Sequence, residues 1–255
     1  MTRPIFENPH LDGSTFFLSG SGNINILLLH GFTATTVEVR PLAKFLHSTG
    51  HSIFAPLLPG HGTRPEDLIS VHWEDWYQAA EEGYKKLAEP GKKIIVGGES
   101  MGGLLSLLLA ANHPEITGIL LFAPALIIRG IWQAKWVAPF RKIMPKGYLK
   151  EANNRTEDQL PWQGYNVLTL PAVAQLATLQ KIINARLDQV AQPILIFQGK
   201  LDGTVDAAGA QKIFNAVRST DKTLIWLEES GHCLLLDREL NQVKSIAHNF
   251  IQRLI

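Results

Sequence analysis

The sequence predicts an α/β fold in which a mostly parallel central sheet is flanked by helices and interrupted by a small helical insertion. Short apolar runs alternate with longer segments of helical periodicity from about residue 24 onward, which is typical of a parallel sheet covered on both faces. That alternation stops for about 65 residues, too many for a plain loop in a compact domain. A glycine-rich junction, "GGESMGG" at 97–103, indicates a sharp turn from strand to helix.

The segments before the interruption come in strand–helix order. The continuous apolar run Ile24–Leu29 predicts a strand buried on both faces. Residues 36–48 have apolar side chains at helical spacing and are followed by Gly50, which predicts a helix with a defined end. The same pattern predicts strands at 51–58, at 93–97 and within 118–126, and helices at 71–91 and 101–112.

The interruption and the segments after it define the expected domains. Residues 127–191 hold three tryptophans, several prolines and helix-like patches, but no clear strand. A strand at 193–199, a helix at 206–218, a strand at 222–229 and an amphipathic helix near 235–254 complete the chain. We therefore expect a core formed by 1–123 and 192–255, with a helical cap formed by 124–191.

Composition excludes several classes of protein. Twenty-four basic and 23 acidic side chains leave a net charge of +1, so we expect no nucleic acid partner. The single cysteine, Cys233, cannot form an internal disulfide, which fits a reducing compartment. The segment "MTRPIFENPHLDG" lacks the apolar core of a secretory signal, and no apolar run approaches the ~20 residues of a membrane span. We expect a cytoplasmic monomer or small homo-oligomer.

The glycine-rich junction contains the pattern G-x-S-x-G over residues 98–102, centred on Ser100. At a sharp strand-to-helix turn, a strained residue can hold its side chain clear of the sheet edge. Close packing at that turn leaves no room for side chains two positions away, a demand that Gly98 and Gly102 meet. The helix N-terminus adds free N–H groups beneath the hydroxyl. The pattern predicts that Ser100 is a nucleophile.

A serine nucleophile needs a histidine base, and three histidines follow Ser100 in the chain. His113 and His248 lie in or at the end of predicted helices, away from the carboxyl edge of the sheet. His232, in "EESGHCLLLD", lies between the last strand and the last helix, where a loop returns to that edge. We expect His232 to be the base.

The histidine in turn needs an orienting acid, expected after the strand at 193–199. Asp202 in "QGKLDGTVD" lies at the right distance past the strand and is favoured. Asp206 is the rival, although it falls where a helix begins and suits an N-cap better.

The tetrahedral intermediate of acyl transfer also needs hydrogen-bond donors for its oxyanion. One expected donor is the backbone N–H of Met101, the residue after the nucleophile. The other is the N–H of Phe32, in the loop "HGFTAT" that follows the first long strand. His30 is expected to brace this loop by hydrogen bonding rather than to take part in the chemistry.

Five motifs in one order carry a resemblance that spans the chain from about residue 24 to the end. They are "HGFT" at 30–33, "PGHG" at 59–62, "GESMGG" at 98–103, "GKLD" at 199–202 and "SGH" at 230–232. The chain resembles the α/β-hydrolase superfamily, and within it the bacterial carboxylesterases and monoacylglycerol lipases with a small helical cap. The "WEDW" at 73–76 adds to the likeness to this subfamily.

The resemblance implies hydrolysis of carboxylic esters through an acyl-enzyme on Ser100. His232 would act as base and then as acid, Asp202 would hold its tautomer, and the cap at 124–191 would supply the acyl and alcohol pockets. No pocket residue can be assigned by pattern, although 151–160 could contact a glycerol-like group. We expect a small-molecule acyl ester as partner, no cofactor and no metal. The apolar and basic segment 126–143 also suits weak contact with a lipid interface.

Two other functions stay open at this point. The same triad could serve thioester hydrolysis, carbon–carbon bond hydrolysis or acyl transfer. A ligand-binding receptor on this scaffold is the alternative outside enzymes, because fold alone does not determine function.

Overall fold

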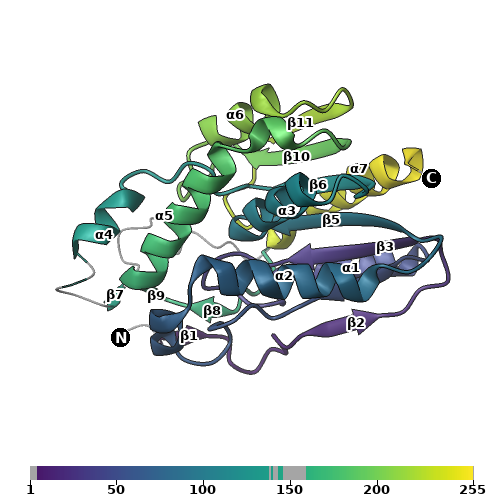
Figure 1. Ribbon diagram of the computed structural model, residues 1–255. Helices are drawn as coiled ribbons and strands as arrows, with labels where there is room; N and C mark the ends of the chain where they lie inside the picture. Colours follow the sequence, from purple (N-terminus) through teal and green to yellow (C-terminus); the bar gives the residue numbers. More distant parts are fainter. Residues whose placement is uncertain (1–4, 138, 140–142, 146–158, 255) are drawn as a thin grey trace.

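The computed structural model describes residues 5–137, 139, 143–145 and 159–254. Within these residues, seven strands form one sheet in the order β11-β10-β6-β5-β3-β4-β2 (Figure 1). In that order they are β11 (Lys222–Leu227), β10 (Ile194–Gly199), β6 (Gly118–Phe122), β5 (Lys93–Glu99), β3 (Ile24–Leu29), β4 (Ser52–Ala55) and β2 (Phe16–Leu18). Neighbours are parallel except β2 and β4, which pair antiparallel. The fold class predicted from the sequence is confirmed.

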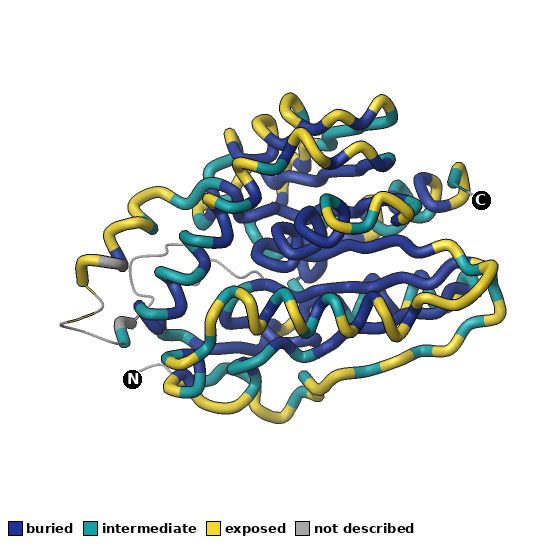
Figure 2. Tube along the Cα trace, viewed as in Figure 1, coloured by how far each residue is buried: buried dark blue, intermediate teal, exposed yellow. Residues whose placement is uncertain are grey.

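Helices cover both faces of the sheet because alternate strand residues point to opposite sides. On one face, strand residues such as Leu27 and Val96 pack with α2 (Trp73–Leu87), α3 (Met101–Asn112) and α6 (Ala208–Ala216). On the other face, residues such as Ile26 and Ile95 pack with α1 (Arg40–Ser48) and α7 (Leu240–Arg253). Figure 2 shows the inner strands of the sheet as a buried layer between these helices, whereas the edge strands β2 and β11 are partly exposed. This burial on both faces explains the unbroken apolar runs in the sequence.

Prolines account for two of the shifts of predicted boundaries. Helix α1 begins at Arg40 rather than at residue 36, because Pro41 lacks an N–H and is tolerated only in the first turn. Residues 36–39 form a turn before it. Strand β4 ends at Ala55, directly before Pro56, rather than at residue 58.

The N-terminal segment contains two short strands that the sequence did not predict. Strand β2 is an edge strand of the main sheet, and β1 (Phe6–Glu7) pairs antiparallel with β8 (Gly164–Tyr165). Strands of two or three residues are too short to establish a period-2 pattern. The second pair joins the start of the chain to a segment more than 150 residues later.

The segment between β6 and β10 contains the residues of the expected cap. Its described elements are η2 (Ile131–Gln133), α4 (Ala134–Val137), β7 (Ile143–Pro145), β8, β9 (Val167–Thr169), α5 (Leu170–Asn184) and η4 (Leu187–Gln189). The expectation of no strand in this segment is wrong, because β7 pairs antiparallel with β9, and β8 with β1. Residues 138, 140–142 and 146–158 lie outside the described part, so most of 151–160 does too.

Helix α5 joins the insertion to the core. Its residues Leu176, Leu179 and Ile183 are buried in the same cluster as α2 and α3. Gln180 Nε2 donates to the carbonyl oxygen of Ala125 at 2.5 Å, and Thr169 Oγ1 donates to the carbonyl oxygen of Pro65 at 2.9 Å. Pro65 begins the short helix η1 (Pro65–Ser70). No helix in the described part is long and apolar enough to cross a membrane.

Candidate active site

Ser100 stands at the turn between β5 and α3. Its backbone has φ 56° and ψ −112°, a strained region for a residue with a Cβ. The backbone N–H of Ser100 donates to the carbonyl oxygen of Phe122 at 2.9 Å, and its own carbonyl oxygen accepts from Gly103 and Ala125 at 3.1 Å each. These bonds to two neighbouring segments hold the strained conformation in place. The Ser100 side chain therefore stands at the carboxyl edge of the sheet, at the N-terminus of α3.

The glycines beside Ser100 allow main-chain contact that no other residue permits. A Cβ at Gly102 would meet the carbonyl oxygen of Leu29 at 2.1 Å, and one at Gly98 would meet the Gly102 carbonyl carbon at 2.4 Å. Helix α3 can therefore begin directly against the end of β3. This contact brings the loop after β3 next to the Ser100 side chain.

His232 joins Ser100 to Asp202. His232 Nε2 lies 3.0 Å from Ser100 Oγ, and His232 Nδ1 lies 2.9 Å from Asp202 Oδ2. His232 comes from the loop after β11 and Asp202 from the loop after β10, so three strand ends at one edge of the sheet supply the three side chains. The sequence-predicted residues are thus brought into one hydrogen-bonded line. The carboxylate accepts from Nδ1–H, which leaves Nε2 free to accept the Ser100 hydroxyl proton.

Asp202 is almost fully enclosed, with its side chain 1% exposed. Its Oδ1 accepts the N–H groups of Thr204 and Val205, both at 2.9 Å. Burial raises the pKa of the Asp202 carboxyl, but the charge and hydrogen bond of His232, with these N–H groups, outweigh it and hold the pKa below its usual value. The carboxylate is therefore ionised at neutral pH, as the hydrogen bond from Nδ1–H requires.

Gln198 is a contact of Asp202 that the sequence analysis missed. Its side chain is fully buried, and its Nε2 donates to Asp202 Oδ2 at 2.9 Å. A lone polar residue inside the apolar strand run "ILIFQG" is the signal that could have drawn attention to it.

The rival acid, Asp206, lies at the start of α6. Its Oδ1 accepts from the N–H of Ala208 at 3.1 Å, and its Oδ2 pairs with Arg129 Nε at 3.0 Å. This is the helix-start environment that the sequence predicts for Asp206. The hydrogen bond to His232 is made by Asp202.

The loop after β3 carries the first expected oxyanion donor, the N–H of Phe32, which donates to no backbone carbonyl in the described part of the chain. The second, the N–H of Met101, belongs to the first residue of α3 and so has no acceptor within the helix. A Cβ at Gly31 would lie 3.2 Å from Ser100 Cβ, which shows how closely this loop approaches Ser100.

His30 braces this loop, as the sequence predicts. Its Nε2 accepts from the N–H of Leu58 at 3.0 Å, and its Nδ1 lies 2.9 Å from the carbonyl oxygen of Gly31. One neutral tautomer, with the proton on Nδ1, satisfies both partners. Complete burial lowers the pKa of His30 to about 4, with the hydrogen bond to Gly31 opposing the shift. His30 is therefore an uncharged brace.

The "PGHG" motif packs beside the same loop. The His61 ring lies 5.0 Å from that of His30 and 6.1 Å from that of Phe32, measured between centroids. The buried Trp76 of "WEDW" contacts the Phe32 ring at 5.8 Å and donates from Nε1 to the carbonyl oxygen of Pro59 at 3.2 Å. Two of the motifs that carry the family resemblance thus pack against the loop after β3.

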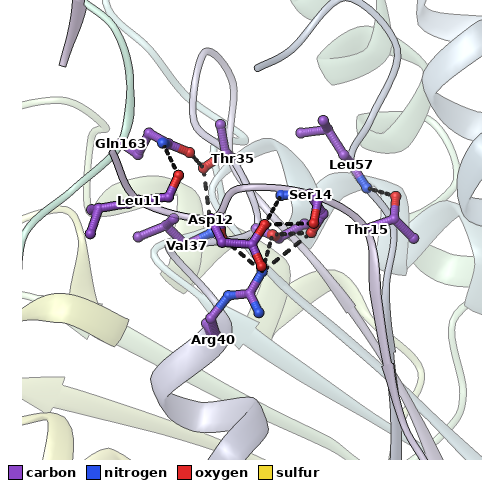
Figure 3. Close-up of polar contacts among 10 residues, drawn as sticks. Leu11, Asp12, Ser14, Thr15, Thr35, Val37, Arg40, Leu57 and Gln163 are labelled. Carbon is purple, nitrogen blue, oxygen red and sulfur yellow. Dashed lines mark hydrogen bonds and ion pairs between the residues drawn. The ribbon is translucent and has the colours of Figure 1, made fainter. Parts of the chain in front are cut away.

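The insertion and the N-terminal segment also reach this loop. Tyr165 donates its N–H to the carbonyl oxygen of Thr33 at 2.9 Å. Gln163 accepts from Thr35 Oγ1 at 2.8 Å and donates to the carbonyl oxygen of Leu11 at 2.6 Å. Figure 3 shows Gln163 bridging these two segments. In the same view, Arg40 pairs with Asp12 at 3.4 Å.

The apolar side of the insertion meets Phe32. Ala134 of α4 and Leu170 and Val173 of α5 form a small buried cluster against which the Phe32 side chain packs. These residues were not named from the sequence, which offers no motif in this segment. Cys233, the residue after His232, is half-buried.

Comparisons with known proteins agree with this geometry. The family model Hydrolase_4, described as serine aminopeptidase S33, matches residues 23–239. The chain belongs to this family of α/β-hydrolases. It is 34% identical over 231 residues to a thermostable monoacylglycerol lipase of Bacillus sp. (strain H-257), covering 91% of each chain. It is 31% identical over 247 residues to a carboxylesterase of Bacillus subtilis (strain 168), covering 93% of this chain and 96% of the relative.

Solved structures extend the likeness. A structure from work on the metagenome-derived lipolytic enzymes LipS and LipT superposes with a TM-score of 0.86 at 27% identity, covering 94% of this chain and 98% of that one. The monoacylglycerol lipase of Paleococcus ferrophilus gives a TM-score of 0.75 at 18% identity, covering 95% and 99%, and shows the shared fold alone. This α/β-hydrolase is an enzyme, and its relatives support ester hydrolysis as its activity.

Proposed function

We propose that the chain is a serine carboxylic ester hydrolase that acts through an acyl-enzyme on Ser100. The observation that carries this proposal is the position of His232, 3.0 Å from Ser100 Oγ and 2.9 Å from Asp202 Oδ2. A serine hydroxyl is a weak nucleophile until a base accepts its proton, and this line of side chains supplies the base and its orienting acid.

In the acylation step, Ser100 Oγ attacks the ester carbonyl carbon while its proton passes to His232 Nε2. The carbonyl oxygen becomes an oxyanion, which the N–H groups of Phe32 and Met101 stabilise. The tetrahedral intermediate then collapses, and the C–O bond to the alcohol breaks. The leaving alkoxide takes the proton from His232 Nε2, and the acyl group stays on Ser100 Oγ.

In the deacylation step, a water molecule attacks the acyl carbon and gives one proton to His232 Nε2. A second oxyanion forms in the same donor pair and collapses with cleavage of the bond to Ser100 Oγ. His232 returns the proton to Ser100, and the carboxylic acid leaves. Throughout both steps, Asp202 accepts the hydrogen bond from Nδ1–H and stabilises the transient imidazolium.

We place the substrate among acyl esters, with monoacylglycerols included. Two relatives above 30% identity are named for monoacylglycerols and carboxylic esters. The cap at 124–191 would supply the acyl pocket, because Ala134, Leu170 and Val173 put an apolar surface against Phe32, next to the oxyanion site.

A panel of p-nitrophenyl esters of increasing acyl length, run beside monoacylglycerols, tests the activity. We expect turnover that survives metal chelation and stops after reaction with an organophosphate. Mass spectrometry of the inhibited protein should find the adduct on the peptide containing Ser100. Ser100→Ala should lower kcat by about 10⁶-fold, the loss seen when a triad serine is removed.

Ser219→Ala is the matched control, since Ser219 is buried and bonds its hydroxyl to the carbonyl oxygen of Asp221, outside the site. It should keep full activity and form the adduct. Ester hydrolysis by Ser100→Ala at the wild-type rate would overturn the proposed mechanism.

A further inference from the structure

Two buried glutamates lie close to the proposed catalytic residues. Glu38, in the turn before α1, is 3% exposed, and Glu99, the last residue of β5, is fully buried. Neither was singled out from the sequence, and neither takes part in the steps described above. Burial of a carboxylate is costly unless specific partners compensate it, so their positions call for a physical explanation.

Glu38 holds the backbone of the oxyanion loop. Its Oε2 accepts from the N–H of Gly31 at 2.6 Å, a short bond of the charge-assisted kind. A Cβ at Gly31 would meet Glu38 Oε2 at 3.0 Å on one side and Ser100 Cβ at 3.2 Å on the other. Gly31 therefore lies in a narrow gap between the Glu38 carboxyl and the nucleophile.

The backbone of Gly31 is held by these contacts rather than by its own conformational preference. A glycine has wide freedom in φ and ψ, so its own geometry does not set the direction of the next N–H. That next N–H belongs to Phe32, the proposed oxyanion donor. Glu38 holds the N–H of Gly31, and His30 Nδ1–H holds its carbonyl oxygen at 2.9 Å. Together they fix both ends of Gly31 and the peptide plane that carries the Phe32 N–H.

The environment of Glu99 disfavours the charged form of its carboxyl. Burial raises the pKa of its carboxyl well above the usual value, and the charge of Glu38 raises it further, against the N–H groups of Leu235 and Leu234. Its Oε1 accepts from Leu235 at 3.3 Å, and its Oε2 has no hydrogen-bond partner among the described residues. Of the two carboxyl groups, Glu38 is the one whose oxygen accepts from the N–H of Gly31.

We propose that Glu38 is a positioning residue for catalysis: through the N–H of Gly31 it aims the N–H of Phe32 at the oxyanion of the tetrahedral intermediate. The inference rests on the proposed ester hydrolysis at Ser100. Oxyanion donors act only when they are held in place before the reaction, and a displacement of about 1 Å can cost about 10²-fold in rate.

The test compares two variants of Glu38. Glu38→Met keeps the length of the side chain and removes the acceptor, while Glu38→Gln keeps a carbonyl oxygen that can accept from Gly31. We expect Glu38→Met to lower kcat on a p-nitrophenyl ester by about 10²-fold, with KM unchanged. Glu38→Gln should recover most of the loss, because the acceptor is restored without the charge.

Inhibition by a trifluoromethyl ketone distinguishes a positioning role of Glu38 from a purely structural one. It adds to a serine hydroxyl as a tetrahedral oxyanion, so its inhibition constant reports on the oxyanion site directly. For Glu38→Met we expect this constant to rise by the same factor as kcat falls. Thermal melting of each variant establishes that the protein is folded.

Gln192→Met is the matched control. Gln192 is also buried, and its Nε2 donates to the carbonyl oxygens of Ala110 and His113, at the opposite edge of the sheet. It should lower the melting temperature while leaving kcat and ketone affinity unchanged.

The inference is overturned if folded Glu38→Met keeps wild-type kcat and ketone affinity, or if Glu38→Gln is as impaired as Glu38→Met. These outcomes are distinct from failure of the proposed function, which shows as hydrolysis by Ser100→Ala. An enzyme in which Ser100→Ala is inactive and Glu38→Met is fully active would retain the mechanism and lose only this inference.

Discussion

The carboxyl edge of the core and the insertion above it differ in how their residues are held. At the edge, Ser100, Asp202 and His232 each have partners at defined distances and are largely buried. In the insertion, Trp132 and Trp136 expose 61% and 73% of their surface, although α5 buries one side against the core. In the proposed function, chemistry would depend on tightly constrained groups that short motifs can mark. Specificity would depend on an apolar surface that no motif marks.

The largest change in kcat among these predictions is expected from a comparison of two aspartates, Asp202 and Asp206. Asp202→Asn should lower kcat by about 10⁴-fold, because an amide no longer stabilises the required histidine tautomer and imidazolium. Asp206→Asn, which changes a carboxylate at the start of α6, should leave kcat unchanged. Steady-state kinetics of both variants on one p-nitrophenyl ester makes the comparison.

A larger loss in Asp206→Asn than in Asp202→Asn would show that the acid role belongs to Asp206 instead. Both variants should melt as cooperatively as the wild type, since both side chains keep acceptors for the backbone N–H groups around them.

A smaller effect, on the free energy of unfolding rather than on kcat, is expected from the titration of His30. Its pKa is about 4 in the folded protein and near 6.5 when exposed, so the unfolded chain binds more protons between these values. Stability therefore rises with pH across this window and is lost as the pH falls from about 6.5 to about 4. The His30 contribution is about 3 kcal/mol, because a pKa difference of one corresponds to about 1.4 kcal/mol.

Urea unfolding at a series of pH values measures this contribution. His30→Gln should flatten the dependence of unfolding free energy on pH between about 4 and 6.5, whatever its effect at neutral pH. His10→Gln, at an exposed position, should leave the dependence as in the wild type. An identical slope in His30→Gln and wild type would show that His30 is not a buried neutral brace.

The smallest change in unfolding free energy is expected from a substitution in the segment between β6 and β10. Trp136→Ala should change the unfolding free energy by no more than about 0.5 kcal/mol, because the side chain is 73% exposed. Leu176→Ala, in the buried side of α5, should cost several times as much. Chemical denaturation measures both, and a large loss in Trp136→Ala would mean that α4 is held as firmly as the core.

Sequence alone could predict the parts of the fold where periodicity is long. Strand β3 and helix α3 lie at the expected Ile24–Leu29 and 101–112 because burial on both faces, or a full helical period, extends across many residues. The predicted start of α1 is too early because apolar spacing alone does not register Pro41. Strands β7, β8 and β9 were missed because two or three residues carry no readable period.

The candidate site was predictable to the extent that its residues stand in motifs. Ser100, Asp202 and His232 follow strand ends, and parallel topology brings strand ends to one edge. Their catalytic roles stay predictions. Glu38, Glu99 and Gln198 were missed because their importance lies in contacts rather than in spacing: Glu99 meets Leu235, 136 residues later. A polar residue in an apolar run was the only signal for Glu99 and Gln198.

Gly102 contacts the end of β3 through main-chain atoms of both segments, since a Cβ at Gly102 would overlap the Leu29 carbonyl. Bond lengths and angles of the main chain are common to all amino acids, whereas side-chain volumes differ with every replacement. The distance between Ser100 and the loop after β3 therefore does not depend on which apolar residues surround them. Hydrolases built on this contact can diverge through much of their interior and keep the same reactive spacing.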